Sequence, residues 1–269
     1  AAVTRMGAIA VGISTFLKAP ELHYVVRHAD VDTLLISNEM LAHDYLARLE
    51  AGFPSLADSP ADGLELAEAP FLRKIWTTGP RARSWLSGTL DDLEALGAQV
   101  ASPGEFLSEM EDGVTPADDA LMIYTSGSTA APKAVVHTHD TVTRHSFAVS
   151  KVVYVGEGDR ICAAMPFFWV GGLLATMLPA FHNGSSLICP GSQDPHELIK
   201  LLKDEQITHL SGWGNVLASI ADQSSEAVEV IQNLRPMTDA QRLFYLREPR
   251  ERIPNQLGMT ETFGHHSSE

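Results

Sequence analysis

One stretch of the chain combines residue types that can bind a polyphosphate. A hydrophobic run over 121–124 breaks into small hydroxyl residues and glycine, and the stretch ends at Pro132 and Lys133. Backbone N–H groups in such a loop can point at an anion, hydroxyl groups add donors, and a lysine adds positive charge. A turn of Ser, Thr and Gly between two strands is the simpler alternative, and the loop alone does not decide between them. The side chains that would contact the phosphates are Thr125, Ser126, Ser128, Thr129 and Lys133.

Several other chemical motifs are absent or incomplete. The Walker A pattern Gly-x-x-x-x-Gly-Lys-[Ser/Thr] does not occur, and neither does a Gly-x-Ser-x-Gly nucleophile elbow. These absences argue against a P-loop kinase and against a serine hydrolase. The closest histidine pairs are His137 with His139 and His265 with His266, and neither has further ligands at metal-site spacing. We therefore expect no structural metal site.

The elements that position these residues follow an alternating pattern. Strand-length apolar runs alternate with helix-length segments, which is typical of helices packed on a largely parallel sheet, so we predict an α/β fold. Loops are expected at 52–70 and 102–119, where Pro, Gly and acidic residues gather. Strands are expected at 8–13, 33–37, 120–124, 134–137, 160–165, 186–189 and 207–210, and helices at 21–29, 40–49, 141–153, 169–181, 196–205 and 216–221.

Composition excludes several classes of protein. The chain has 269 residues, of which 34 are acidic and 19 basic, so its formal charge is −15. A chain this acidic repels a phosphate backbone, and we expect no nucleic-acid binding. The longest apolar stretch, 167–181, is shorter than the roughly 20 residues that span a bilayer, so we expect no transmembrane segment. Cys162 and Cys189 both lie in apolar runs, as buried free thiols do, which favours a reducing compartment and a cytoplasmic location.

Three segments together resemble a known family. The stretch 124–133, YTSGSTAAPK, resembles the signature loop of the AMP-binding, adenylate-forming superfamily, of the acyl-CoA synthetase type. Residues 165–172 resemble that family's aromatic segment beside the acyl pocket, and 257–264 resemble its later Gly-x-Thr-Glu motif. The motifs occur in the family's order, and the resemblance runs nearly from end to end of the chain.

The resemblance implies a two-step ligase that uses ATP, Mg²⁺ and coenzyme A. A carboxylic acid attacks the α-phosphate of ATP to form an acyl-adenylate, and a thiol then takes the acyl group. The implied fold is the large N-terminal domain of the adenylate-forming enzymes. Thr260 would contact the α-phosphate side and Glu261 would ligate Mg²⁺, and both would be catalytic. By the same resemblance, the nucleotide contacts are Thr125, Ser126, Gly127, Ser128, Thr129, Lys133, Leu257, Gly258 and Met259, with Thr125 also near the metal.

The acyl pocket would be formed partly by 168–172. Its implied lining residues are Phe168, Trp169, Val170, Gly171 and Gly172, with the paired glycines allowing close approach of a ligand to the backbone. The aromatic pair favours an apolar acyl group, so we predict a fatty acid, with an aryl acid as the competitor. Trp169 can equally plug the pocket, and simple core packing is the structural alternative for this segment.

The sequence departs from the family pattern at three positions. Ala130 and Ala134 stand where the family usually has glycine, and each alanine would cost about 1 kcal/mol if a positive φ is required there. Leu257 stands where many members place an aromatic residue on the adenine ring. These departures weaken the expected nucleotide binding, with the adenine contacts affected most.

The sequence also stops before several family features. It lacks the family's ribose-binding aspartate, its hinge, and the small C-terminal domain with its catalytic lysine. We therefore predict a partial N-terminal domain over 1–269, with subregions at about 1–118 and 119–269, that is impaired in turnover. The alternative is a non-catalytic nucleotide- or acyl-binding relative. The sequence leaves open whether the chain forms a homodimer.

Overall fold

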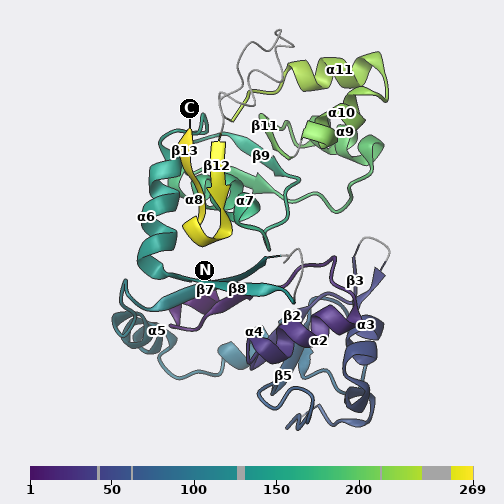
Figure 1. Cartoon of the computed structure of the whole chain (residues 1–269), viewed down its shortest axis with the longest axis vertical. Helices are drawn as coiled ribbons and strands as arrows, with labels where there is room; N and C mark the ends of the chain where they lie inside the picture. The colour runs from purple at the N-terminus through teal and green to yellow at the C-terminus, as the bar shows by residue number, and fades with distance from the viewer. Residues whose placement is uncertain (41–42, 62, 126–130, 213, 238–255, 269) are drawn as a thin grey trace. The chain divides into compact units, whose positions relative to one another are not determined.

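The computed structural model describes residues 1–40, 43–61, 63–125, 131–212, 214–237 and 256–268. Within these ranges only the backbone is described at 214–215, 217, 226, 256–257 and 265–268. The chain forms two compact units, Ala1–Ala134 and Val135–Glu269, and the boundary falls inside one strand, β8 (Lys133–Thr138). Figure 1 shows the elements of each unit.

Parallel pairing organises the strands of the first unit. β1 pairs with β7 and β8 completes their sheet, while β2, β5 and β6 form a second parallel sheet. The strands are β1 (Ala10–Gly12), β2 (Thr33–Ile36), β5 (Lys74–Thr77), β6 (Gly88–Thr89) and β7 (Asp119–Thr125), with a short antiparallel pair of β3 (Glu39–Met40) and β4 (His43–Asp44). The helices are α1 (Ala2–Arg5), α2 (Ala19–His28), α3 (Tyr45–Gly52), the 3-10 helix η1 (Pro54–Asp58), α4 (Leu90–Gly97) and α5 (Pro103–Asp112).

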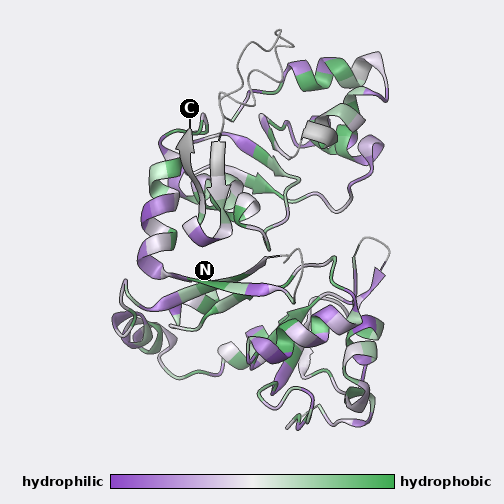
Figure 2. Cartoon of the chain, in the orientation of Figure 1, coloured by the Kyte–Doolittle hydropathy of each residue, from purple (hydrophilic) through white to green (hydrophobic). Residues whose placement is uncertain are grey.

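Helix α2 illustrates how the local sequence sets an element. Pro20 stands in its first turn, where a missing N–H is harmless, and the Glu21 carboxylate accepts the Lys18 backbone N–H at 2.9 Å. Leu22, Val25 and Val26 are buried on one face, and Figure 2 shows hydrophobic and hydrophilic residues alternating along the helix. The amphipathic pattern therefore determines which side of α2 meets the core.

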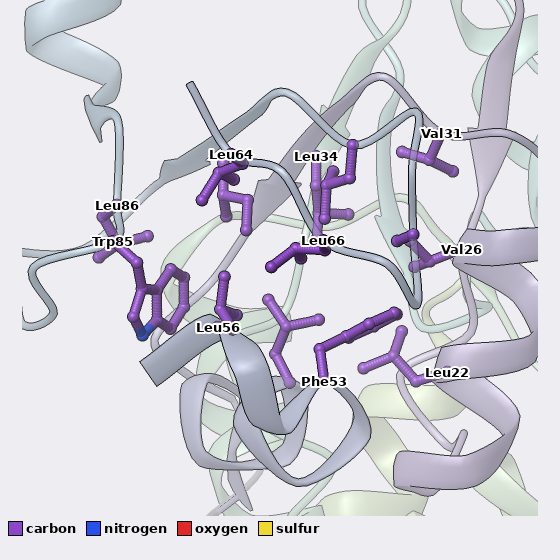
Figure 3. Packing of buried hydrophobic residues seen from close by; sticks show 14 of the residues in the cluster. Leu22, Val26, Val31, Leu34, Phe53, Leu56, Leu64, Leu66, Trp85 and Leu86 are labelled. Atoms are coloured by element: carbon purple, nitrogen blue, oxygen red, sulfur yellow. The ribbon is translucent and has the colours of Figure 1, made fainter. Parts of the chain in front are cut away.

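A leucine-rich core holds the first unit together. Phe53 is fully buried at the end of α3, and Leu56 and Leu66 are buried with it (Figure 3). Trp85 belongs to the same cluster, and its Nε1 donates to the Glu50 carboxylate at 3.0 Å. The indole thus contributes apolar area while its one polar group is hydrogen-bonded.

The second unit is built on a parallel sheet in which β9 lies between β10 and β11. The strands are β9 (Arg160–Ala163), β10 (Ser186–Ile188), β11 (His209–Ser211), β12 (Gln256–Met259) and β13 (Gly264–Ser268). The helices are α6 (His139–Ser150), α7 (Val170–Gly172), the π-helical turn η2 (Leu173–Met177), α8 (Leu178–Asn183), α9 (Pro195–Asp204), α10 (Gly214–Ala221), α11 (Ser225–Gln232) and the 3-10 turn η3 (Thr260–Thr262). β12 and β13 pair antiparallel around η3, in yellow in Figure 1.

A buried polar network joins the start of β9 to β11. The Asp159 carboxylate accepts the Gly156 N–H at 2.9 Å and pairs with Arg235. His209 is fully buried, with its Nε2 2.9 Å from the carbonyl oxygen of Tyr154. Burial lowers the pKa of His209, because the cation cannot be solvated there. The network therefore satisfies polar groups that the parallel sheet encloses.

These sheets and helices confirm the predicted α/β class with largely parallel sheets. In the part of the chain that the structure describes, no helix combines the length and apolar character that a bilayer crossing requires. The predicted subregions, about 1–118 and 119–269, remain a prediction, and the two units given above divide the chain within β8.

Three secondary-structure predictions were wrong. The helix expected at 40–49 begins only at Tyr45, because the Asp44 side chain caps it by accepting the Ala47 N–H at 2.8 Å. The loop expected at 102–119 contains α5, which has Pro103 in its first turn. The helix expected at 169–181 is interrupted by the π-helical turn η2 shortly before Pro179, a residue that cannot donate to the preceding turn.

The two cysteines differ, against expectation. Cys162 is fully buried in β9, and burial raises the pKa of its thiol to about 12. Cys189 is exposed, because it follows the last residue of β10 and no longer lies in the sheet. A short apolar run therefore predicted burial correctly for only one of the two thiols.

Candidate functional site

A pocket of about 310 Å³ lies in the second unit. One wall comes from the segment that leads into α7 and η2, and the other from the β12–β13 hairpin, which Figure 1 shows beside α7. Among the described lining residues, Thr260 carries a hydroxyl group and Trp169 an indole N–H, the other side chains are apolar or absent, and none is charged. The lining residues are Met165, Trp169, Val170, Gly171, Leu174, Ala175, Gly258, Met259, Thr260 and Gly264.

Gly172, the last residue of α7, sets the position of the first wall. A Cβ on Gly172 would lie less than 3.0 Å from the backbone carbonyl oxygen of Pro166. The first helical turn therefore packs directly on the preceding segment, and this close packing orients Trp169 and Val170 toward the pocket. The Trp169 carbonyl accepts the Leu173 N–H at 3.2 Å, which continues the helix. Trp169 itself is 36% exposed, so it forms part of the pocket's rim.

The second wall is a tight turn between β12 and β13. The Phe263 N–H donates to the Thr260 carbonyl at 3.0 Å, and the Thr262 hydroxyl donates to the Gly264 carbonyl at 2.8 Å. Phe263 has a φ of 54° and Gly264 a φ of 104°, and only glycine adopts the latter readily. The turn directs Thr260 into the pocket lining and leaves Glu261 exposed beside it.

His137 in β8 contacts this turn at two points. Its Nε2 lies 2.8 Å from the Thr260 carbonyl oxygen, and its ring meets the ring of Phe263 edge-on at 4.9 Å. His137 is 4% exposed, and burial lowers its pKa, against the opposing effects of the Thr260 hydrogen bond and the Glu261 charge. Because a carbonyl oxygen can only accept, Nε2 carries the hydrogen and donates it.

The sequence had paired His137 with His139 as a weak metal candidate. Among the residues described here, no group of three or more His, Cys, Asp or Glu side chains could hold a metal ion. The contact with Thr260 escaped sequence reasoning because 123 positions separate the two residues. No spacing rule links residues so far apart.

The predicted phosphate loop is described only at its two ends. Ser126, Gly127, Ser128 and Thr129 lie outside the described residues, as does Ala130. Thr125 ends β7, and its hydroxyl lies 3.5 Å from the carbonyl oxygen of Lys133, the exposed first residue of β8. Ala134 lies in β8 and does not have a positive φ, so the backbone penalty expected for alanine there does not arise.

Most of the other predicted site residues occur around the pocket. Those in its lining are Trp169, Val170, Gly171, Gly258, Met259 and Thr260. Phe168 lies outside the lining and contacts Trp169 edge-on at 5.2 Å, while Gly172 faces the Pro166 backbone rather than the pocket. The backbone of Leu257 belongs to β12, and its side chain is outside the description. Lining residues that had no predicted role are Met165, Leu174, Ala175 and Gly264.

One protein family and several individual proteins are similar to this chain. Residues 1–268 match the AMP-binding enzyme family. YngI of Bacillus subtilis (strain 168), whose name describes an acyl-CoA synthetase, is 28% identical over 216 residues, which cover 78% of this chain and 38% of that protein. The 3-hydroxybenzoate–CoA ligase of Aromatoleum sp. (strain CIB) is 27% identical over 237 residues, covering 88% of this chain and 40% of that ligase. The chain thus spans well under half the length of these relatives.

A solved structure has a similar fold. The crystal structure of the anthranilate CoA ligase AuaEII, in complex with anthranoyl-AMP, superposes with a TM-score of 0.68 at 20% identity. The match covers 99% of this chain and 48% of that ligase, so the likeness extends over both units. The family match over residues 1–268 shows that this chain belongs to the AMP-binding enzyme family.

Proposed function

We propose that the chain contributes the nucleotide- and acyl-binding part of an ATP-dependent ligase that activates a carboxylic acid as an acyl-adenylate. Transfer of the acyl group to coenzyme A would complete the reaction. The observation that carries the proposal is the pocket whose apolar wall meets a turn bearing Thr260 and Glu261. Such a site can bury an acyl chain while its polar edge contacts the phosphate where charge develops.

In this proposal each polar residue has a separate task. The Thr260 hydroxyl would donate to the α-phosphate from within the pocket lining. Thr125 and Lys133, together with 126–129, would hold the β- and γ-phosphates. Gly258 and Met259, with Leu257, would lie on the adenine side.

Glu261 fits a magnesium ion that arrives with the nucleotide. Mg²⁺ in nucleotide sites commonly binds one or two carboxylates together with substrate phosphates, and needs no cage of protein ligands. The exposed Glu261 carboxylate meets that requirement, and Thr125 is the second candidate contact. Bound Mg²⁺ would neutralise charge on the phosphates during transfer.

The lining of the pocket favours an apolar acid. An α-amino group or a second carboxylate would be buried there without a partner, because no described lining side chain is charged. We propose a fatty acid as the substrate class. An aryl acid is the competing outcome, and the two differ in the chain-length dependence of binding.

We expect ATP·Mg²⁺ to stabilise the chain against heat. A ligand at 100 times its Kd adds about 2.7 kcal/mol to the free energy of unfolding, which raises the Tm measurably. Glu261→Gln keeps the size of the side chain but removes a Mg²⁺ ligand, so it should weaken ATP·Mg²⁺ binding about tenfold. Glu229→Gln, a change to an exposed carboxylate on α11, is the matched control and should leave the shift unaltered.

The results of these measurements distinguish a ligase from a relative that does not catalyse the reaction. No shift at millimolar ATP·Mg²⁺ would contradict nucleotide binding in any form. A shift without ATP–pyrophosphate exchange, for fatty and aryl acids alike, would instead favour a relative that binds nucleotide without activating an acid.

A further inference from the structure

We propose that His137 is a positioning residue, which holds the Thr260–Glu261 turn in its working geometry by donating a hydrogen bond from Nε2 to the Thr260 carbonyl. The inference rests on the proposed function, because it concerns the roles given there to Thr260 and Glu261. His137 does not belong to the pocket lining, so its effect on ligand binding would act through the Thr260–Glu261 turn.

The Thr260 carbonyl oxygen is the point at which hydrogen bonds fix the turn. It accepts the Phe263 N–H at 3.0 Å, which closes the turn from inside, and it lies 2.8 Å from Nε2 of His137. A carbonyl oxygen has two lone pairs, so both hydrogen bonds form together. The first bond sets the shape of the turn, and the second attaches the turn to β8.

The turn needs this attachment because its backbone is strained. Phe263 has φ 54° and ψ 42°, a left-handed conformation that costs a residue with a side chain free energy. Its ring is fully buried and lies edge-on to His137. The imidazole therefore contacts the turn twice, through Nε2 at the Thr260 carbonyl and through its ring at Phe263.

Among the described residues, no hydrogen bond holds the side chain of Thr260 or of Glu261, the two residues that this turn presents. Glu261 is exposed, and the hydroxyl of the following residue, Thr262, makes its described hydrogen bonds within the hairpin, to the Met259 N–H and carbonyl and to the Gly264 carbonyl. A displacement of the Thr260 carbonyl would thus move the Thr260 side chain and Glu261 together. Small errors of position weaken contacts to phosphate and metal strongly.

Two substitutions test the role of the Nε2 donor. In His137→Gln, the side-chain amide nitrogen can reach the position of the histidine Nε2. In His137→Asn, the side chain has one methylene fewer, so its amide nitrogen cannot reach that position. Both variants bury an amide, so the pair differs chiefly in whether the Thr260 carbonyl keeps its second donor. Affinity is measured by calorimetry with ATP·Mg²⁺ and with ATP in EDTA, and amide hydrogen exchange is followed over 256–268.

We expect His137→Asn to weaken ATP·Mg²⁺ binding about tenfold and to leave binding of metal-free ATP less affected, because Glu261 is displaced. Exchange over the hairpin should speed up about tenfold while β9 and β11 stay protected. His137→Gln should stay within about threefold of the unmodified chain in both measurements. In a Glu261→Gln background, His137→Asn should remove little further Mg²⁺-dependent affinity, since the two changes act on one interaction.

The inference would be overturned if the Asn and Gln variants had the same ATP·Mg²⁺ affinity and hairpin exchange. It would also be overturned if the affinity losses of His137→Asn and Glu261→Gln were fully additive. In both cases the proposed function would stand. If the unmodified chain binds no ATP·Mg²⁺, the proposed function fails and the inference fails with it. If exchange over β9 and β11 shows that the Asn variant is unfolded, the Gln variant decides the question. Retained ATP·Mg²⁺ affinity in the Gln variant supports the inference, and a tenfold loss there overturns it.

Discussion

Replacing Gly172 by alanine is expected to lower the free energy of unfolding by about 3 kcal/mol, a large loss for a single methyl group. The added Cβ would lie less than 3.0 Å from the Pro166 carbonyl oxygen and close to its carbonyl carbon. Both are backbone atoms, so the clash can be relieved only by moving the start of α7 or the segment before it. The φ of Gly172 is −67°, which any residue adopts, so the loss arises from the close packing alone.

The neighbouring glycine provides the control. A Cβ on Gly171 would meet the Met165 sulfur at 3.3 Å, and this flexible side chain can shift. Both glycines lie in α7, so the gain in helix propensity on changing glycine to alanine is about 1 kcal/mol in either case. The difference between Gly172→Ala and Gly171→Ala in urea unfolding therefore isolates the clash with Pro166. Equal midpoints and slopes for the two variants would contradict the packing described here.

Gly264→Ala is expected to cost a similar amount for two reasons. A φ of 104° is strained for alanine, by about 1–2 kcal/mol. The added Cβ would also lie less than 3.0 Å from Cδ2 of Leu174, which is 1% exposed and lines the pocket. Overpacking of this kind costs about 1–3 kcal/mol. We expect a total loss near 3 kcal/mol, measured by urea unfolding.

A double-mutant cycle separates the two causes. Leu174→Ala alone should destabilise by about 2–5 kcal/mol, because it leaves a cavity. In the double variant Leu174→Ala with Gly264→Ala, the clash is gone and only the backbone strain remains. The double variant should therefore lose at least about 1 kcal/mol less than the sum of the two single losses. Strict additivity would mean that Leu174 does not pack against Gly264.

The sequence predicted helices and strands correctly where the spacing of neighbouring apolar residues determines them. Helix α2 was predicted, at 21–29, because its apolar residues recur at helical spacing, and the structure adds a proline in its first turn. Helix α5 was missed although it has the same proline signal, because none of its residues is buried and its acidic composition suggested a loop. The end of β10 shows the same limit, because Cys189 continues the apolar run but is exposed.

The pocket required information that local signals do not contain. The Gly-x-Thr-Glu motif and the aromatic segment before α7 were recognised separately as patterns. The way these segments meet makes Met165 and Leu174 part of the pocket wall. It also makes Gly172 pack against the Pro166 backbone rather than leave room for a ligand. His137 is the clearest case, because its partner Thr260 lies 123 positions away and the contact is made to a backbone carbonyl.

Calorimetry with non-hydrolysable acyl-adenylate analogues would show whether this pocket binds the acyl group of an acyl-adenylate. The analogues would carry hexanoyl, octanoyl and decanoyl chains, with AMP as the chain-free reference and an ω-amino decanoyl analogue as the charged control. Each methylene buried against Met165, Trp169 and Leu174 contributes about 0.8 kcal/mol, so Kd should fall about fourfold per methylene until the pocket is full. The terminal amine should cancel most of that gain, because its charge would be buried without a partner. Affinities that do not change with chain length, or an ω-amino analogue that binds as well as the decanoyl one, would show that this pocket does not bury the acyl chain.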